Sequence, residues 1–217
     1  STQLNNFLKH SGYFESEDEK TVRQNVLQII SDIANNFVQH VARQKGFPEE
    51  DAKRCSALLL QFGSVSVGVN SGGSDNDLVM VAPEFVDSTH FFNLFAQFLK
   101  NDETLAVETI NCIPQAYVPV MNLIAQNCQV DIVFARVNHF SPTQELLDDV
   151  AILPRHDTMS LRSLNGYRAT ESIKNSVAEE SRMAFRGATR MIKMWADRRG
   201  IYGTVYGYLN GVSCAIM

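Results

Sequence analysis

The segment Gln129–Ala135, QVDIVFA, constrains the fold most, because it carries a carboxylate in the middle of an apolar run. A strand points its side chains alternately to two faces, which puts Val130, Ile132 and Phe134 on one face and Asp131 on the other. Burying an unpaired carboxylate costs free energy. Asp131 is therefore paired or bound to a cation, or it lies on an edge strand and faces water.

Four further apolar runs have the length of strands and are separated by turn residues. They are Ala57–Phe62, Leu78–Ala82, Leu105–Ile110 and Tyr117–Ile124. Pro83 closes the second run, and the pair Asn127-Cys128 indicates a hairpin leading into the strand that contains Asp131. Together these runs predict a sheet.

A long helix is expected before the first strand. Ser16 and Glu19 have the spacing of a capping box, in which each residue satisfies a backbone N–H near the other. Gly46 and Pro48 end the helix. One face of this helix is apolar, because apolar residues recur at helical spacing, namely Val22, Val26, Ile29, Ile33, Phe37 and Val41.

Other helices are expected between and after the strands. Asp87 can cap a helix that continues through Leu99, and a long helix spans Ser181–Arg199 and stops at Gly200. The acidic stretch Ser141–Thr158 is predicted to be a loop with a short helix. This order of helices and strands predicts an α/β (α+β) fold, with a sheet domain over residues 1–175 and the start of a helical domain over residues 176–217.

Composition narrows the class of protein. The 217 residues, 45% of them hydrophobic, can bury a substantial core. A formal net charge of -5 argues against a protein that coats nucleic acid by bulk electrostatics. No run reaches the roughly eighteen apolar residues of a membrane span, and the four scattered cysteines indicate reduced thiols. The chain ends within the apolar run GVSCAIM, so we expect a truncated chain.

Two further acids precede the second strand. Asp75 and Asp77 are two residues apart and would project from the same face, although alone they favour the interpretation as a solvated acid pair. With Asp131 on a neighbouring strand, they form a set of oxygen ligands of the kind that Mg²⁺ prefers. Two such ions can clamp the attacking and leaving oxygens in phosphoryl transfer. The turn at Gly63-Ser64, separated from Asp75 by ten residues, lets backbone N–H groups approach a phosphate.

The helix over Ser181–Arg199 has a basic face. Arg182, Arg186, Arg190 and Lys193 share this face, which a solvated amphipathic helix would also explain for the three arginines. Lys193 lies at the border with the apolar side, where a partly shielded ammonium suits a triphosphate.

Two residues outside this helix have plain structural explanations. Tyr202 follows Gly200 on a loop and can reach a phosphate, but it also fits a surface tyrosine packed on the helix end. Asn165, in SLNG, fits an ordinary turn residue.

The ordered motifs resemble those of eukaryotic nuclear poly(A) polymerases, within the nucleotidyltransferase superfamily. The resemblance runs through essentially the whole chain. It is carried, in order, by FGSVSVGVNSGGSDNDLVMVAP, AYVPVMNL, VDIVFAR, RSLNGYRAT, IKMWADRRGIYG and NGVSCAIM. It implies a mixed nucleotidyltransferase sheet flanked by helices, followed by the beginning of a helical middle domain.

The resemblance also implies an activity, which is template-independent addition of AMP from ATP to RNA 3′ ends in mRNA 3′-end processing. Asp75, Asp77 and Asp131 would hold Mg²⁺ or Mn²⁺, and Asp131 would accept the 3′-hydroxyl proton. The implied nucleotide site also contains Phe62, Gly63, Ser64, Ser71, Asn76, Asn165, Lys193, Tyr202, Gly211 and Val212. RNA and polyadenylation factors are the implied partners, and a monomer in the nucleus, away from membranes, is expected.

Several positions depart from the family pattern. Val65-Ser66 replaces a Tyr-Arg pair, Asn76 replaces an aliphatic residue, Cys214 replaces a tryptophan and Thr204 replaces an asparagine. Two other functions stay open. One is a related RNA uridylyl- or adenylyltransferase, and the other, for this chain alone, is a non-catalytic nucleotide- or protein-binding module.

Overall fold

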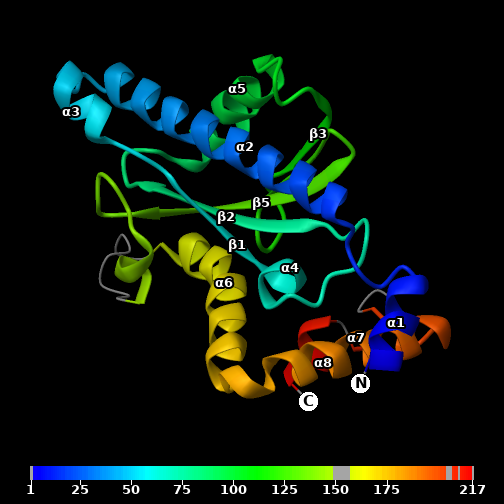
Figure 1. Ribbon diagram of the computed structural model, residues 1–217. Helices are drawn as coiled ribbons and strands as arrows, with labels where there is room; N and C mark the ends of the chain where they lie inside the picture. The colour runs from blue at the N-terminus through cyan, green and yellow to red at the C-terminus, as the bar shows by residue number, and fades with distance from the viewer. Residues whose placement is uncertain (1, 149–156, 204–206, 210, 217) are drawn as a thin grey trace.

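The computed structural model describes residues 2–148, 157–203, 207–209 and 211–216 (Figure 1). Its centre is a five-stranded sheet in the order β1-β2-β5-β4-β3. β2 and β5 are parallel, and the other neighbouring pairs are antiparallel. The strands are β1 (Leu58–Phe62), β2 (Asn76–Pro83), β3 (Val107–Ile113), β4 (Val120–Ala125) and β5 (Cys128–Val137). The predicted strands are therefore confirmed, with ends shifted by a few residues.

Helices cover both faces of the sheet (Figure 1). On one face lie α2 (Glu17–Gln44), the π-helix η1 (His90–Phe95) and α5 (Ala96–Asn101), and on the other lies α6 (Thr158–Ser176). Alternation along the strands divides the core accordingly. Ile132 and Phe134 of β5 pack in the cluster beneath α2, while Val133 and Ala135 pack in the cluster beneath α6. The predicted alternation of β5 is confirmed.

Local signals explain several element boundaries. The capping box at Ser16 and Glu19 starts α2 as predicted, and Gly46, with φ of 86°, follows its end. The hairpin before β5 is also confirmed, but its two turn residues are Gln126 and Asn127, with φ of 53° and 59°, one position earlier than expected. Positive φ at both positions suits the twist of a two-residue hairpin.

The helix expected after Asp87 is present in an altered form. Asp87 caps it, since its Oδ1 accepts the N–H of His90 at 2.9 Å, but its first turns are the π-helix η1 and only Ala96–Asn101 is α-helical. Phe91 and Phe95 are fully buried, and Phe91 stacks on Phe134 of the sheet at 5.0 Å. The part of the acidic stretch at residues 149–156 lies outside the described residues, and a 3-10 helix, η2 (Gln144–Asp148), precedes it.

The end of α6 leads away from the sheet to a group of helices (Figure 1). After the 3-10 turn η4 (Glu179–Ser181) come α7 (Arg182–Arg198) and α8 (Gly211–Ile216), and α1 (Thr2–His10) packs against α7. Two further short helices are α3 (Glu49–Arg54), which follows α2, and α4 (Gly63–Val67), which follows β1. The division of the chain at residues 175 and 176, near the end of α6, stays a prediction.

The close packing of α6 on β1 gives a test of the fold. A Cβ added at Gly166 would lie 2.6 Å from Cε2 of Phe62, whereas one added at Gly187 in α7 would meet nothing within 4 Å. We expect Gly166→Ala to lower the free energy of unfolding by about 1–3 kcal/mol, because the core becomes overpacked. Gly187→Ala should raise it by up to about 1 kcal/mol through helix propensity. Urea denaturation of both variants measures the difference, and equal effects would contradict this packing.

A partly buried ion pair near the start of α2 predicts a pH effect. Arg23 donates from Nε and Nη2 to the two carboxylate oxygens of Glu15, at 2.8 and 2.9 Å. These bonds hold the pKa of Glu15 below its usual value. The pair therefore stabilises the fold fully above the unfolded glutamate pKa of about 4.3, and the contribution is lost as pH falls through the lower folded pKa. Denaturation at pH 6.5 should show Glu15→Gln less stable than the parent, and the gap should close towards pH 3. A gap that does not narrow would contradict the pairing.

Candidate active site

The three predicted acids lie at the start of two neighbouring parallel strands. Asp77 of β2 is the register partner of Asp131 of β5, and Asp75 lies two residues ahead of Asp77. β5 lies between β2 and β4. Asp131 is therefore on an interior strand, and the alternative of an edge strand facing water is wrong.

Like charges in a half-buried place perturb these acids. Burial, with the nearby charges of Asp75 and Asp131, raises the pKa of Asp77 to about 7. Burial also raises the pKa of Asp131, and a hydrogen bond from Nδ2 of Asn122 to its Oδ1, at 2.7 Å, opposes that rise. In the described ranges no group of three or more His, Cys, Asp or Glu side chains has the spacing of a formed metal site. The donors are nonetheless all carboxylate oxygens, and a divalent cation would relieve their repulsion.

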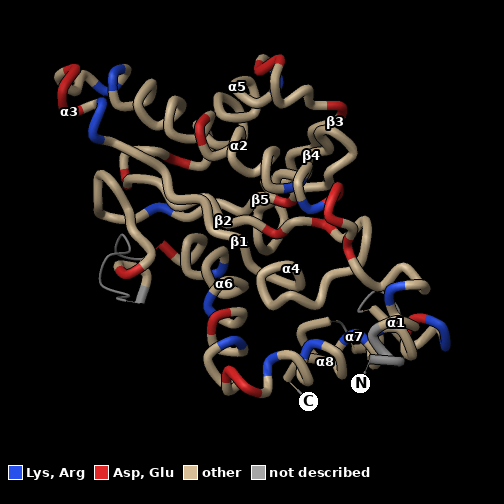
Figure 2. Tube along the Cα trace, in the orientation of Figure 1, with Lys and Arg blue, Asp and Glu red and all other residues tan. Residues whose placement is uncertain are grey.

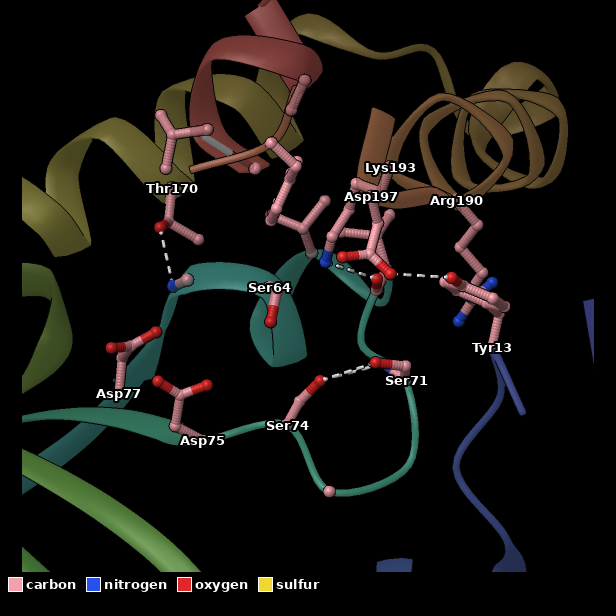
Figure 3. A pocket seen from close by; sticks show the side chains of 18 of the residues that line it. Tyr13, Ser64, Ser71, Ser74, Asp75, Asp77, Thr170, Arg190, Lys193 and Asp197 are labelled. Atoms are coloured by element: carbon pink, nitrogen blue, oxygen red, sulfur yellow. Dashed lines mark hydrogen bonds between the residues drawn. The ribbon is translucent and has the colours of Figure 1, made fainter. Parts of the chain in front are cut away.

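A cavity of about 590 Å³ opens beside Asp75 and Asp77 (Figure 3). Its walls come from α4, the loop before β2, α6, α7 and α8, together with Tyr13. Nine of the predicted nucleotide-site residues line it, namely Gly63, Ser64, Ser71, Asp75, Asp77, Lys193, Tyr202, Gly211 and Val212. Asp75 and Asp77 lie at one end, and the cations Arg190 and Lys193 lie at another, together with Asp197 (Figure 3). The cavity therefore presents opposite charges to whatever occupies it.

Four predicted residues do not line this cavity. Asp131 lies in β5 beside Asp77, and the ring of Phe62 packs under α6 at Gly166. Asn76 is buried with 1% exposure, and its Nδ2 donates to the carbonyl oxygen of Gln129 at 2.9 Å. Asn165 is an exposed residue within α6, so its interpretation as a turn residue is wrong. Thr204 lies outside the described residues.

Gly63 lies at a helix start, where its backbone approaches an acid. Gly63-Ser64 begins the helix α4 instead of a turn, and the N–H of Gly63 donates to Oγ1 of Thr170 at 3.0 Å. Gly63 has φ of 71°, and a Cβ there would overlap Oδ2 of Asp77. The glycine is required because the backbone passes directly beside this carboxylate.

The basic face of α7 is turned towards the protein. Arg186 Nε donates to the carbonyl oxygen of Val67 at 2.9 Å, and Lys193 Nζ donates to that of Val69 at 3.3 Å. Arg190 Nε reaches the carbonyl oxygen of Asn70 at 3.4 Å. The alternative of a solvated basic face is therefore wrong for Arg186 and Arg190. Figure 2 shows basic residues recurring along this helix.

Lys193 has the partial burial that its position in the sequence indicated. Burial lowers the pKa of its ammonium and Arg190 lowers it further, while Asp75 acts in the opposite direction. An incompletely solvated cation next to the cavity is suited to binding an anionic group.

Sequence reasoning missed several lining residues. Tyr13 and Asp197 line the cavity and are joined by a hydrogen bond of 3.2 Å from the Tyr13 hydroxyl (Figure 3). Thr170 and Ile173 enter from α6, a helix whose sequence has little apolar periodicity. No local pattern marks these residues, because long-range packing of the N-terminal segment, α6 and α7 brings them together.

Two solved structures have the same fold as this chain. The Cid1 poly(U) polymerase, described as bound to Mg and 3′-dATP, matches 94% of this chain and 49% of its own with a TM-score of 0.58 at 18% identity. The polymerase core of the RNA surveillance complex TRAMP matches 98% of this chain and 51% of its own, with a TM-score of 0.58 at 17% identity. At such low identity these matches show the fold, which is that of a nucleotidyltransferase.

Sequence comparisons identify the family. The family described as the poly(A) polymerase nucleotidyltransferase domain matches residues 1–177, and the poly(A) polymerase central domain matches residues 184–217. The chain belongs to the poly(A) polymerase family.

Two named relatives show how much of such a protein the chain represents. Poly(A) polymerase PAPalpha of Candida albicans is 36% identical over 97% of this chain, and the poly(A) polymerase of Dictyostelium discoideum is 34% identical over 100% of it. The chain spans 37% and 27% of the lengths of these two relatives. Within the described residues, no helix combines the length and apolar character that crossing a membrane requires.

Proposed function

We propose that this chain is the catalytic part of a polymerase that adds AMP from ATP to RNA 3′ ends without a template. The observation that carries the proposal is the cavity, which places two strand-end acids opposite two partly buried cations in a chain of this family. By family resemblance, the whole protein would act in mRNA 3′-end processing in the nucleus, as a monomer that meets polyadenylation factors.

Asp75, Asp77 and Asp131 would hold Mg²⁺ or Mn²⁺. The fit rests on the clustering of three carboxylates and on the raised pKa of Asp77, which reflects mutual repulsion as well as burial. When bound, the cations would stabilise the negative charge that develops during phosphoryl transfer.

The other residues would bind and orient the reactants. Lys193 and Tyr202 would contact the triphosphate, Ser64 and Ser71 would line its path, and Gly211 and Val212 would lie beside the adenine. Asp131 would accept the proton of the attacking 3′-hydroxyl. Catalysis of this kind depends on positioning and charge stabilisation, with no covalent intermediate on the protein.

Incubation of an RNA primer with each of the four nucleoside triphosphates separately, in Mg²⁺, tests the proposal. We expect extension with ATP in the longest natural protein that contains this chain. The second candidate function is uridylyl transfer, favoured by the shared fold of the Cid1 poly(U) polymerase and of a cytoplasmic RNA terminal U-transferase. Preferential extension with UTP would establish that function and overturn ours.

The 217-residue chain by itself remains a candidate for a non-catalytic binding module. It spans only about a third of the relatives' length, so we propose that it binds ATP weakly and extends RNA poorly on its own. Robust tailing by the isolated chain would overturn this second proposal and strengthen the first.

A further inference from the structure

The loop Val69–Gly73 connects the helix α4 to the acids of the cavity. Val69, Ser71, Gly72 and Gly73 line the cavity, and Asp75 follows almost directly. Within the loop, the N–H of Ser71 donates to Oγ of Ser74 at 3.0 Å. The position of this loop therefore determines where Asp75 lies relative to the cavity.

Two segments far apart in the sequence hold the loop from opposite sides. From α7, Lys193 and Arg190 donate to the carbonyl oxygens of Val69 and Asn70, at 3.3 and 3.4 Å. From the N-terminal segment, Glu15 accepts a hydrogen bond from Nδ2 of Asn70 at 3.1 Å. Asn70 is only 7% exposed, so its amide depends on this partner.

The N-terminal segment is itself fixed at both ends. Arg23 of α2 holds Glu15 with two hydrogen bonds, and Glu19 of α2 lies beside the far end of the loop, where a Cβ added at Gly72 would be 3.2 Å from its Oε1. On the other side, the guanidinium of Arg190 lies over the ring of Phe14, 4.2 Å from its centroid, and the Tyr13 hydroxyl donates to Asp197. Residues 13–15 thus link α2, the loop and α7.

We propose that Tyr13–Glu15 is a positioning strap that keeps the loop Val69–Gly73 pressed against α7, with Phe14 as its main contact. Phe14 does not line the cavity and acts through Arg190, whose Nε reaches the loop. The effect on nucleotide binding rests on the proposed function, because ATP is the expected occupant of the cavity. Losing the ring would free Arg190 and let the loop move away from the site of the triphosphate.

Backbone hydrogen exchange of residues 69–75 tests the strap without any ligand. Phe14→Ala should raise exchange rates in this segment about three- to tenfold, the loss expected for a partly buried cation–π contact. Phe14→Tyr keeps the ring and should restore protection. Phe7→Ala is the matched control, because Phe7 also lies near an arginine of α7, with Arg198 at 5.7 Å, but does not contact the loop. Asn70→Ala, which removes the bond to Glu15, should loosen the same segment.

Unchanged exchange in Phe14→Ala, or an equal change in Phe7→Ala, would overturn the strap.

Titration of each variant with ATP in the presence of Ca²⁺ then tests whether the strap affects nucleotide binding. The dissociation constant for ATP should rise about three- to tenfold in Phe14→Ala and stay near the parent value in Phe14→Tyr. Equal ATP affinity in a loosened Phe14→Ala would overturn the positioning role. Absence of ATP binding by the longest natural protein that contains this chain would instead overturn the proposed function, while hydrogen exchange would still decide whether the strap exists.

Discussion

Replacement of Asp77 by asparagine is expected to abolish AMP transfer while making the metal-free fold more stable. The carboxylate is half-buried beside Asp75 and Asp131, and its pKa is raised to about 7. The charged carboxylate therefore destabilises the fold. This destabilisation is absent below about pH 4, grows as pH rises towards 7 and is constant above pH 7. Asparagine keeps the size but removes this cost, so the melting temperature in EDTA at pH 8 should rise.

Activity should respond in the opposite direction, because asparagine is a poorer ligand for Mg²⁺. A loss of about a thousandfold or more in AMP incorporation is expected, corresponding to several kcal/mol of lost charge stabilisation in the transition state. Thermal unfolding in EDTA and primer extension with Mg²⁺ measure the two effects on one protein preparation. Retained activity, or a fall in the melting temperature at pH 8, would show that Asp77 does not have this role.

Replacement of Gly63 by alanine should damage the site through the geometry of its backbone. The residue has φ of 71°, and a Cβ would overlap Oδ2 of Asp77, so the carboxylate must move. The left-handed backbone alone should cost about 1–2 kcal/mol of stability. A displaced reacting group can cost about a hundredfold in rate, and we expect a loss of that size in AMP incorporation.

Gly46→Ala is the matched control for this prediction. Gly46 has φ of 86°, but a Cβ there would meet nothing within 4 Å, and the residue lies at the end of α2 away from the cavity. Both variants should lose similar stability in urea denaturation, and only Gly63→Ala should lose activity. Equal activities would mean that the approach of Gly63 to Asp77 is unimportant for the reaction.

Local patterns in the sequence were sufficient for much of the sheet. Alternation and turn residues located all five strands, and the capping box at Ser16 located the start of α2. The same patterns placed Asp75, Asp77 and Asp131 on neighbouring strand ends, because parallel pairing brings equivalent ends together. These features depend on short-range rules, which a single sequence displays directly.

Other features depend on contacts between distant segments. The helix α6 was not predicted, since Asn165 and Gly166 interrupt its weak apolar pattern and read as a turn. The three arginines on the basic face of α7 fitted a solvated helix face, although Arg186 and Arg190 bond to carbonyl groups about 120 residues earlier in the chain. Asn76 was assigned to the nucleotide because of its neighbours, yet its side chain satisfies buried groups in the core. The structure of α6, the burial of the α7 arginines and the partners of Asn76 are all determined by tertiary packing.

Primer extension with Mg²⁺ and ATP by the Asp131→Ala variant of the longest natural protein that contains this chain tests the central claim most directly, because Asp131 is the one proposed metal ligand that does not line the cavity. Asp131 belongs to the site only if the three acids act together on bound cations. The account predicts a folded protein, shown by an unchanged circular dichroism spectrum, with no detectable AMP incorporation. Near-normal incorporation by the folded variant would contradict it.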